Sequence, residues 1–338
     1  MNVAVIGLGR MGRRHLQAAR DLGATIVGAA DPSEDNAKLA AQEHQLASDV
    51  MFRDASELLR ACKPDCLIVA STAPSHAPVT LEAAAAGVPF IVCEKPMASS
   101  LAECDDMITA CKRAGTKLAI NHQMRLMEQY IEAKKLLDAP ELGGWSSVNV
   151  VAGNIGIAMN GIHYFELFRW LTGELPSQVT AWFAKEPVKS PRGPQFSDRA
   201  GQVRVAVPSG KRLYLEIGDD QGHGLKVVYA GRNGMFVAGE LGGTIESVVR
   251  DAEHRELPTT RYGMPATTRK LAVAPADAVV PSRRVIEALV NGGDYPTGED
   301  GRTAIEVLVA AFVSAESGNV PIAVRPESLP RGRRFDYA

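Results

Sequence analysis

Three glycines near the start of the chain have the spacing of a phosphate-binding turn. Gly7, Gly9 and Gly12 follow an apolar run at 2–6, and residues of helical composition come next. In such a unit the first glycine makes the tight turn, the second lets the backbone approach a pyrophosphate, and the third allows close helix–strand packing. The free N–H groups of the new helix then hold the diphosphate. The expected dinucleotide contacts in this turn are Gly7, Gly9, Arg10, Met11 and Gly12.

An acidic residue closes the second predicted strand. The run at 25–30 ends on Asp31, nineteen residues after Gly12. A carboxylate at this point accepts hydrogen bonds from an adenosine ribose. The same negative charge repels a 2′-phosphate. We therefore expect NAD(H) as the cofactor in preference to NADP(H).

Polar residues follow another apolar run, at 66–70. Hydroxyls and a proline at the carboxyl end of a parallel strand lie where open α/β sheets bind their ligands. An ordinary helix start, which also favours serine and proline, is the alternative interpretation, and the sequence favours neither. The candidate cofactor contacts here are Ser71, Thr72, Pro74 and His76.

A lysine follows the next predicted strand, which ends at Cys93. Lys95 would stand at the ligand-binding edge of the sheet, where its ammonium can donate to a substrate hydroxyl and stabilise negative charge on oxygen. With a lowered pKa it can also relay a proton. The alternative is a solvated lysine before a turn, and this motif taken alone favours that alternative.

Taken in order, these motifs resemble the glucose–fructose oxidoreductase/inositol dehydrogenase/rhizopine-catabolism (Gfo/Idh/MocA) family. The resemblance covers roughly residues 1–125 and includes the glycine turn, Asp31-Pro32, the turn at 71–76 and Glu94-Lys95-Pro96. It implies that Lys95 is catalytic and contacts both cofactor and substrate, that Glu94 contacts the cofactor, and that Asp31 contacts the adenosine ribose.

The segment at 121–125 follows the sixth predicted strand. The family carries an arginine-containing segment here, near the substrate and the nicotinamide. Arg125 matches that arginine, whereas Met124 stands where a second arginine is common. On this resemblance, Gln123 is expected to contact the cofactor, and Asn121 and Arg125 the substrate.

A predicted helix from 161 to 173 carries a histidine that fits a second family pattern, Asp-x-Gly-x-His-x-x-Asp. Gly161 and His163 match it, and Glu166 replaces the last acid. The resemblance implies that His163 transfers a proton and contacts the substrate. Without that resemblance, a lone histidine on a helix is more often a satisfied core residue.

The first acid of this pattern is missing. Met159 stands at its position, with Asn160 beside it. An asparagine can hydrogen-bond a substrate hydroxyl but cannot carry a proton at neutral pH. Either His163 and Lys95 do the acid–base work while Asn160 contacts the substrate, or the chain belongs to a branch with altered chemistry.

The length of 338 residues predicts two domains. We expect an NAD-binding Rossmann domain at 1–122, an α/β doubly wound parallel sheet. An α+β domain for substrate binding and oligomerisation is expected at 123–338, with a large open, mainly antiparallel sheet. Alternating apolar runs between 177 and about 240 support that sheet, whereas the proline-rich, charged stretch at 185–199 is predicted to be a loop over the site or at a subunit edge.

Composition excludes several other classes of function. A net charge of −2 gives no electrostatic footprint for nucleic acid or an anionic membrane. No apolar run approaches the ~18 residues that a membrane span needs, and no apolar leader precedes the first strand, so we expect a cytoplasmic protein. Five cysteines predict reduced thiols, and because no His or Cys cluster completes a metal site we expect no metal.

These observations predict an NAD(P)-dependent dehydrogenase acting on CH–OH groups. The resemblance implies hydride transfer to or from a secondary hydroxyl or ketone of a sugar, cyclitol or nucleotide sugar, and a homo-oligomer (dimer or tetramer). The alternative is a cofactor-binding regulatory or scaffold protein that has lost turnover, which the missing acid favours. Retention of both Lys95 and His163 favours the enzyme.

Overall fold

The first half of the chain forms a six-stranded sheet in the order β3-β2-β1-β4-β5-β6, with every pair parallel. The computed structural model describes residues 1–153, 156–190, 192–222, 224–239, 242–258 and 265–337. The strands are β1 (Asn2–Ile6), β2 (Thr25–Ala30), β3 (Met51–Phe52), β4 (Cys66–Val69), β5 (Phe90–Cys93) and β6 (Lys117–Ile120). Strands β2 and β3 are added on one side of β1, and strands β4 to β6 on the other. The boundary between β1 and β4 is therefore the topological switch point, where doubly wound sheets bind dinucleotides.

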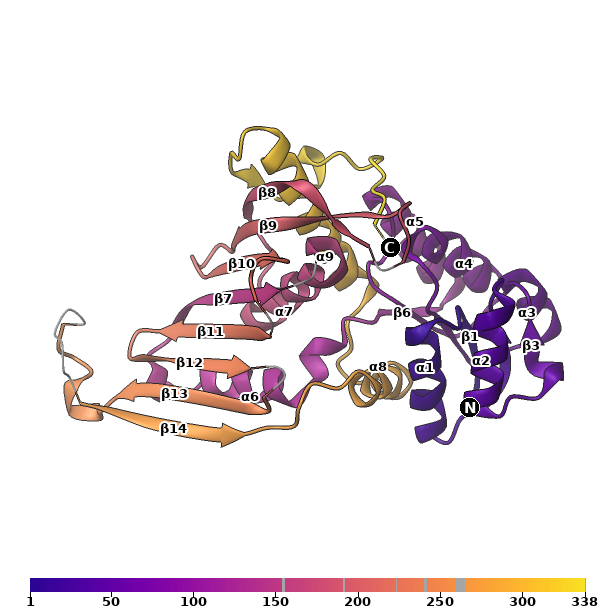
Figure 1. Ribbon diagram of the computed structural model, residues 1–338, viewed down its shortest axis with the longest axis horizontal. Helices are drawn as coiled ribbons and strands as arrows, with labels where there is room; N and C mark the ends of the chain where they lie inside the picture. The colour runs from indigo at the N-terminus through magenta and orange to yellow at the C-terminus, as the bar shows by residue number, and fades with distance from the viewer. Residues whose placement is uncertain (154–155, 191, 223, 240–241, 259–264, 338) are drawn as a thin grey trace.

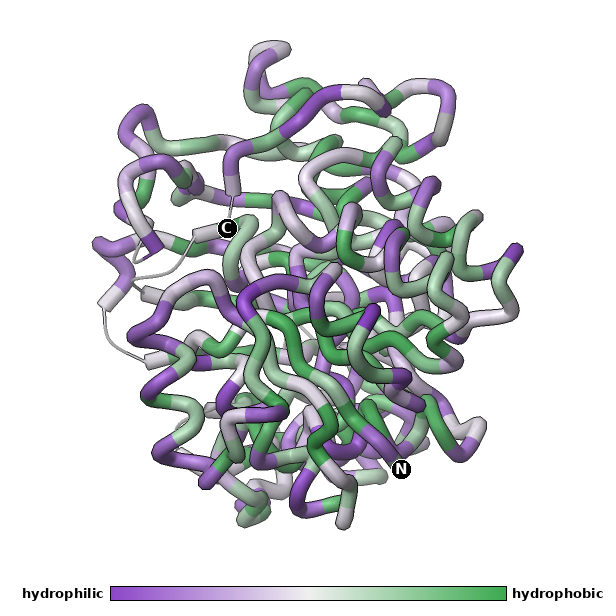
Figure 2. The backbone as a smooth tube through the Cα atoms, turned by 90° about the vertical axis from the view of Figure 1, so that its right-hand side faces the viewer, coloured by the Kyte–Doolittle hydropathy of each residue, from purple (hydrophilic) through white to green (hydrophobic). Residues whose placement is uncertain are grey.

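Helices between these strands cover both faces of the sheet. They are α1 (Arg10–Asp21), α2 (Glu34–His44), α3 (Ala55–Ala61), α4 (Ala73–Ala85) and α5 (Leu101–Ala114), with a short turn η1 (Ser48–Val50) before β3. Several begin at a side-chain cap, and the predicted N-cap Ser33 is confirmed because its hydroxyl accepts from the Asn36 N–H. The strands are apolar runs such as β4, in which every residue is buried, as expected for a sheet covered on both faces. Figure 2, which faces this half, shows hydrophobic chain through its interior and hydrophilic segments around it.

The second half is built on a nine-stranded sheet in the order β14-β13-β12-β11-β7-β10-β9-β8-β15. Its strands are β7 (Trp145–Gly153), β8 (Gln178–Lys189), β9 (Ser197–Ala206), β10 (Arg212–Gly218), β11 (Leu225–Gly231), β12 (Gly234–Gly239), β13 (Thr244–Arg250), β14 (Ala266–Ala272) and β15 (Ile322–Ala323). The β7–β10 pair is parallel and the other described pairs are antiparallel. The large, mainly antiparallel sheet is therefore confirmed.

Helices lie on one face of this sheet (Figure 1). They are α6 (Glu128–Leu137), α7 (Ile162–Thr172) and α9 (Gly298–Glu316). Shorter turns are η2 (Gln123–Leu126), η3 (Pro140–Leu142), the π-helical turn η4 (Ile157–Gly161), η5 (Ala252–His254) and η6 (Pro326–Ser328). The Ala181 N–H donates to the Ser314 hydroxyl at 3.0 Å, which ties β8 to α9.

One helix from the second half packs on the first. In Figure 1, α8 (Val279–Asn291) lies beside α1, and its residues Val285, Ile286 and Leu289 are fully buried in the same cluster as β1 and β4 side chains. The predicted domain boundary at 122/123 falls just before η2, and it stays a prediction.

Three further observations bear on the sequence expectations. The stretch predicted as a loop at 185–199 is strand at both ends, because β8 continues to Lys189 and β9 begins at Ser197. The five cysteines are free thiols. None of the described helices is both long enough and apolar enough to cross a bilayer.

Candidate active site

The glycine turn between β1 and α1 leaves room for a phosphate. A Cβ on Gly7, whose φ is +89°, would lie 2.5 Å from the Ser71 nitrogen, and a Cβ on Gly12 would lie 1.8 Å from the Gly7 carbonyl oxygen. A Cβ on Gly9, by contrast, would have no atom of the described residues within 4 Å other than those of its chain neighbours. Gly9 also begins α1 with no side-chain cap, so the first N–H groups of the helix are left for an anion. The turn therefore fits a pyrophosphate.

The Asp31 carboxylate is fixed at the edge of this turn. Its Oδ2 accepts from the Leu8 N–H at 2.7 Å, and its Oδ1 accepts from the Ser33 N–H at 2.8 Å. The Asn36 amide also donates to both oxygens, at 3.4 Å each. These bonds hold the carboxylate where the second strand ends, and its contact with a ribose stays a prediction.

The turn after β4 leads into α4, as the helix-start interpretation predicts, and the cofactor contacts expected there stay a prediction. Thr72 precedes α4 and its hydroxyl makes no cap, whereas the Ser75 hydroxyl donates to the Ser71 hydroxyl at 2.6 Å. His76 is buried, with Nδ1 2.8 Å from the Pro96 carbonyl oxygen and Nε2 3.1 Å from that of Ser71. Burial lowers the pKa of His76. His76 therefore joins the turn after β4 to the turn after β5, which is a structural role.

Glu94 anchors a buried polar network behind Lys95. Its Oε1 accepts from His15 Nε2 and from the Asn121 amide, each at 2.8 Å, and the Asn121 amide also donates to the Ser282 hydroxyl at 3.2 Å. Burial acts to raise the pKa of Glu94, but the hydrogen bond and charge of His15, with the charge of Lys95, lower it further than burial raises it. Asn121 is fully buried and holds Glu94, and its predicted contact with the substrate stays a prediction.

Lys95 reaches from the end of β5 to the second half of the molecule. Its Nζ donates to the carbonyl oxygen of Met159 in η4. Burial lowers the pKa of Lys95 to about 8, because the ammonium loses more hydration than the neighbouring carboxylate of Glu94 restores. An amine with such a pKa can exchange a proton near neutral pH.

His163 lies on α7, next to η4, and is 6% exposed. Burial lowers its pKa well below the ordinary value, and the charge of Lys95 lowers it further. The ring packs edge-on against His122, with ring centres 5.5 Å apart. His122 is fully buried, and burial lowers its pKa to about 3. Both imidazoles are therefore neutral at neutral pH, because burial makes the protonated form of each less favourable.

Arg125 lies in a buried ion-pair cluster. Its Nη1 is 3.0 Å from Glu166 and 3.4 Å from Asp300, and its Nη2 is 3.1 Å from Asp294. The side chain is 1% exposed and ties η2 to α7 and α9, and its predicted contact with a substrate stays a prediction. Burial raises the pKa of Glu166 to about 7, against the opposing charges of Arg125 and Arg169.

Two predicted contacts keep their earlier assignment as candidates. Gln123 is buried at the start of η2, and its Oε1 accepts no hydrogen bond from the described residues. Asn160 is half-buried in η4, beside Met159. Sequence reasoning missed His15, His122 and Ser282, whose partners become visible only once distant strands and helices are placed together. Among the described residues, no group of three or more His, Cys, Asp or Glu is arranged to hold a metal ion.

The carboxyl ends of β1, β4, β5 and β6, together with η4 and α7, thus bring the predicted residues to one region. Residues 1–122 match the model of a family described as an oxidoreductase family with an NAD-binding Rossmann fold, Gfo/Idh/MocA. This match supports the resemblance of these residues to the Gfo/Idh/MocA family. The predicted Rossmann half and its class of cofactor, NAD, are thereby confirmed.

Proteins with similar sequences include named dehydrogenases. D-apiose dehydrogenase of Paraburkholderia graminis is 33% identical over 195 residues, which cover 53% of this chain and 51% of that enzyme. Inositol 2-dehydrogenase 2 of Saccharopolyspora erythraea is 27% identical over 97% of both chains. The chain thus spans about half the length of the first relative and almost all of the second.

Solved structures share the whole architecture. An oxidoreductase from Agrobacterium radiobacter, in complex with NAD⁺, L-tartaric acid and magnesium, superposes with a TM-score of 0.80 at 18% identity, over 96% of this chain and 98% of that one. At this identity the likeness shows the fold alone.

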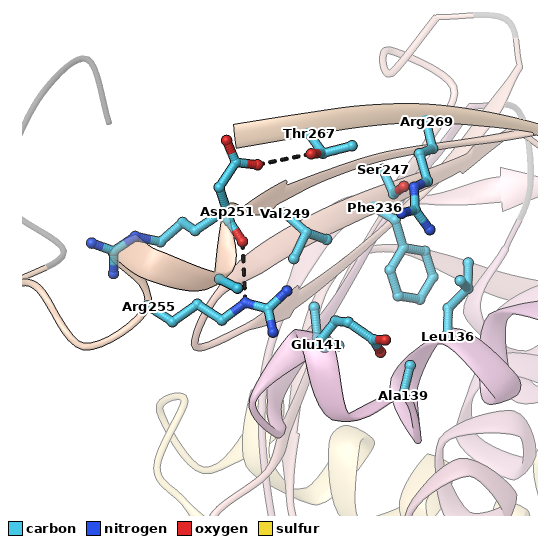
Figure 3. A pocket seen from close by; sticks show the side chains of 13 residues that line it. Leu136, Ala139, Glu141, Phe236, Ser247, Val249, Asp251, Arg255, Thr267 and Arg269 are labelled. Carbon is cyan, nitrogen blue, oxygen red and sulfur yellow. Dashed lines mark hydrogen bonds between the residues drawn. The ribbon is translucent and has the colours of Figure 1, made fainter. Parts of the chain in front are cut away.

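A separate cavity opens between α6, η3 and the outer strands β12–β14 (Figure 3). Its walls include the apolar side chains of Leu136, Phe236 and Val249, with Arg255 and Arg269 beside them. None of the predicted site residues lines it. The candidate active site is therefore distinct from this cavity.

Proposed function

We propose that this protein is an NAD(H)-dependent oxidoreductase that transfers a hydride to or from a secondary hydroxyl or ketone of a sugar, cyclitol or nucleotide sugar. One contact carries the proposal. Lys95, at the nucleotide-binding edge of the first sheet, donates a hydrogen bond to η4, the turn that comes just before His163 in the chain. When bound, the cofactor supplies the hydride acceptor or donor. The dehydrogenase names of the relatives support the class of substrate.

The residues divide the remaining work. In the oxidative direction, neutral His163 accepts the hydroxyl proton while the Lys95 ammonium stabilises the negative charge that develops on the oxygen. Burial of Lys95 strengthens its interaction with this negative charge because little water screens it, whereas burial of His163 opposes its protonation. In this proposal the Asn160 amide, beside Met159, hydrogen-bonds a neighbouring hydroxyl of the substrate. Glu94 holds the Lys95 backbone N–H at 3.2 Å and so fixes the turn.

The test is an absorbance assay at 340 nm with NAD⁺ and a panel of pentoses, inositols and nucleotide sugars. We expect reduction with one class of substrate. In Lys95→Met, kcat/KM should fall by about 10²–10⁴-fold, since both an acid–base group and a charge stabiliser are lost. The matched control is Lys112→Met, because Lys112 is an exposed lysine paired with Glu299. Equal rates in Lys95→Met and wild type would contradict the proposal.

A regulatory or scaffold protein is the second candidate, and the presence of Met159 and Asn160 where the family pattern has an acid favours it. The two functions differ in a simple measurement. Cofactor that co-purifies with the protein and is released on denaturation, without turnover of any substrate in the panel, supports the regulator. Turnover that disappears in Lys95→Met supports the enzyme.

A further inference from the structure

A carboxylate from β9 holds the backbone of η4. Asp198 is 4% exposed. Its Oδ1 accepts from the Ala158 N–H at 2.9 Å, and its Oδ2 accepts from the Met159 N–H at 2.8 Å. Its Oδ1 also accepts from the N–H of Arg199 at 2.7 Å. Two successive N–H groups of η4 are therefore fixed by one buried side chain.

A glycine makes room for this contact. A Cβ on Gly156 would lie 2.0 Å from Asp198 Oδ2, so a larger residue would push the carboxylate away. Gly156 is buried and has ordinary extended φ and ψ angles (−100° and 162°), so the close approach of Asp198, and not backbone conformation, is what requires glycine.

The backbone of Met159 links Asp198 to Lys95. Its N–H donates to Asp198, and its carbonyl oxygen accepts from the Lys95 ammonium. Position 159 is where the family pattern predicts an acid, and the methionine there carries no charge. A backbone carbonyl therefore meets Lys95, and a carboxylate stands behind the same short segment.

We propose that Asp198 is a positioning residue for Lys95, which fixes the η4 backbone so that the Met159 carbonyl receives the ammonium and which supplies the negative charge missing at position 159. The consequence for turnover rests on the proposed function. The effect on Lys95 itself does not, because it follows from the contacts and charges of the folded chain.

Charges around Lys95 oppose one another. Burial and the arginines lower its pKa, whereas the carboxylates of Glu94 and Asp198 raise it. Burial raises the pKa of Asp198 itself, and the three N–H donors and Lys95 act in the opposite direction. The charged and titratable groups that interact with Lys95 are Arg10, Glu94, His122, His163, Arg192 and Asp198. Removing the charge of Asp198 should therefore lower the pH at which Lys95 loses its proton.

The experiment measures that pH directly. Wild type and Asp198→Asn are labelled briefly with an amine-reactive acetylating reagent at a series of pH values, and labelling of Lys95 is quantified by peptide mass spectrometry. We expect the midpoint to fall by about one pH unit in Asp198→Asn, the order of magnitude for one charge removed from a partly buried site. Glu174→Gln is the matched control, since the exposed Glu174 also accepts from a backbone N–H, that of Ser209.

A second variant, Gly156→Ala, tests the same contact in case Asp198→Asn does not fold. Gly156→Ala keeps the carboxylate but displaces it, so the Lys95 midpoint should shift in the same direction. If both variants fold and both keep the wild-type midpoint, Asp198 does not act on Lys95 and the proposal is overturned. Where a substrate is turned over, kcat should fall about tenfold in Asp198→Asn. Absence of turnover in wild type would contradict the proposed function and leave the labelling result decisive for Asp198.

Discussion

At the scale of single residues, the site depends on carboxylates that hold positive or hydrogen-bonding partners. Glu94 fixes the turn that carries Lys95, and Asp31 fixes the Leu8 N–H of the glycine turn. Both acids are nearly buried, so each hydrogen bond they make is strong and each loss would leave an unpaired group. The positions of these two side chains are thus set by the same backbone that they stabilise.

Asp31 provides the prediction for cofactor choice. Asp31→Asn keeps an oxygen for the Leu8 N–H but removes the negative charge that repels a 2′-phosphate. We expect the ratio of kcat/KM with NAD⁺ to that with NADP⁺ to fall by about tenfold or more, because one charge–charge repulsion is lost. Steady-state kinetics with both cofactors measure it. An unchanged ratio would mean that discrimination comes from elsewhere in the site.

Glu166 provides a prediction for pH dependence. Its pKa in the folded protein is about 7, above the ordinary value for a glutamate, because burial favours the neutral acid. Because the folded protein holds this proton more tightly than the unfolded chain does, the group stabilises the fold fully at pH values below its pKa in the unfolded chain. This stabilisation is lost as the pH rises through the folded pKa of about 7. We therefore expect the free energy of unfolding to decline between pH 5 and 8.

The variant Glu166→Gln isolates this contribution. The glutamine stays neutral at every pH, so the decline in the free energy of unfolding between pH 5 and 8 should be smaller than in wild type. Urea titrations at several pH values test this. The same slope in both proteins would show that the charges of Arg125 and Arg169 outweigh burial, so that Glu166 remains ionised throughout.

At the scale of elements, the sequence predicts well what depends on local pattern. The strand, glycine turn and helix at the N-terminus are confirmed because turn chemistry and apolar runs specify them within a few residues. The prolines and charges at 185–199 predict a loop, yet residues 187–189 at one end pair with residues 197–199 at the other, as parts of β8 and β9. Asp198 could not be predicted from there, since its partners in η4 are forty residues away along the chain.

Helix α8 carries the prediction at this scale. Its Ile286 is fully buried in the core that β1 and β4 share with α1, although it follows those strands by more than two hundred residues. Ile286→Ala should lower the free energy of unfolding by about 2–5 kcal/mol, through lost burial and a cavity. Val280→Ala on the same helix is the control, because Val280 is 38% exposed. Equal urea midpoints for both variants would show that α8 does not stabilise the first half.

At the scale of the whole molecule, the nine-stranded sheet has one face covered by helices and one face open. The register places Val151, Trp182, Tyr214, Met235 and Val248 on the open face, where each is 39–50% exposed. Exposed apolar side chains spread across one sheet face are typical of a protein–protein contact. A row of this kind in a single chain favours association with a second copy, as the family resemblance also implies.

Two charges placed on this face should prevent that association. We expect wild type to elute with the mass of a dimer or tetramer in size-exclusion chromatography with light scattering, and Trp182→Glu/Met235→Glu to elute with the mass of one chain. Buried glutamates without partners would cost more than the contact gains. Leu175→Glu is the control, since Leu175 is 68% exposed but lies in the turn after α7, outside the sheet. A wild-type monomer would contradict the predicted association, whereas an oligomer that survives both charges would place its contact on another surface.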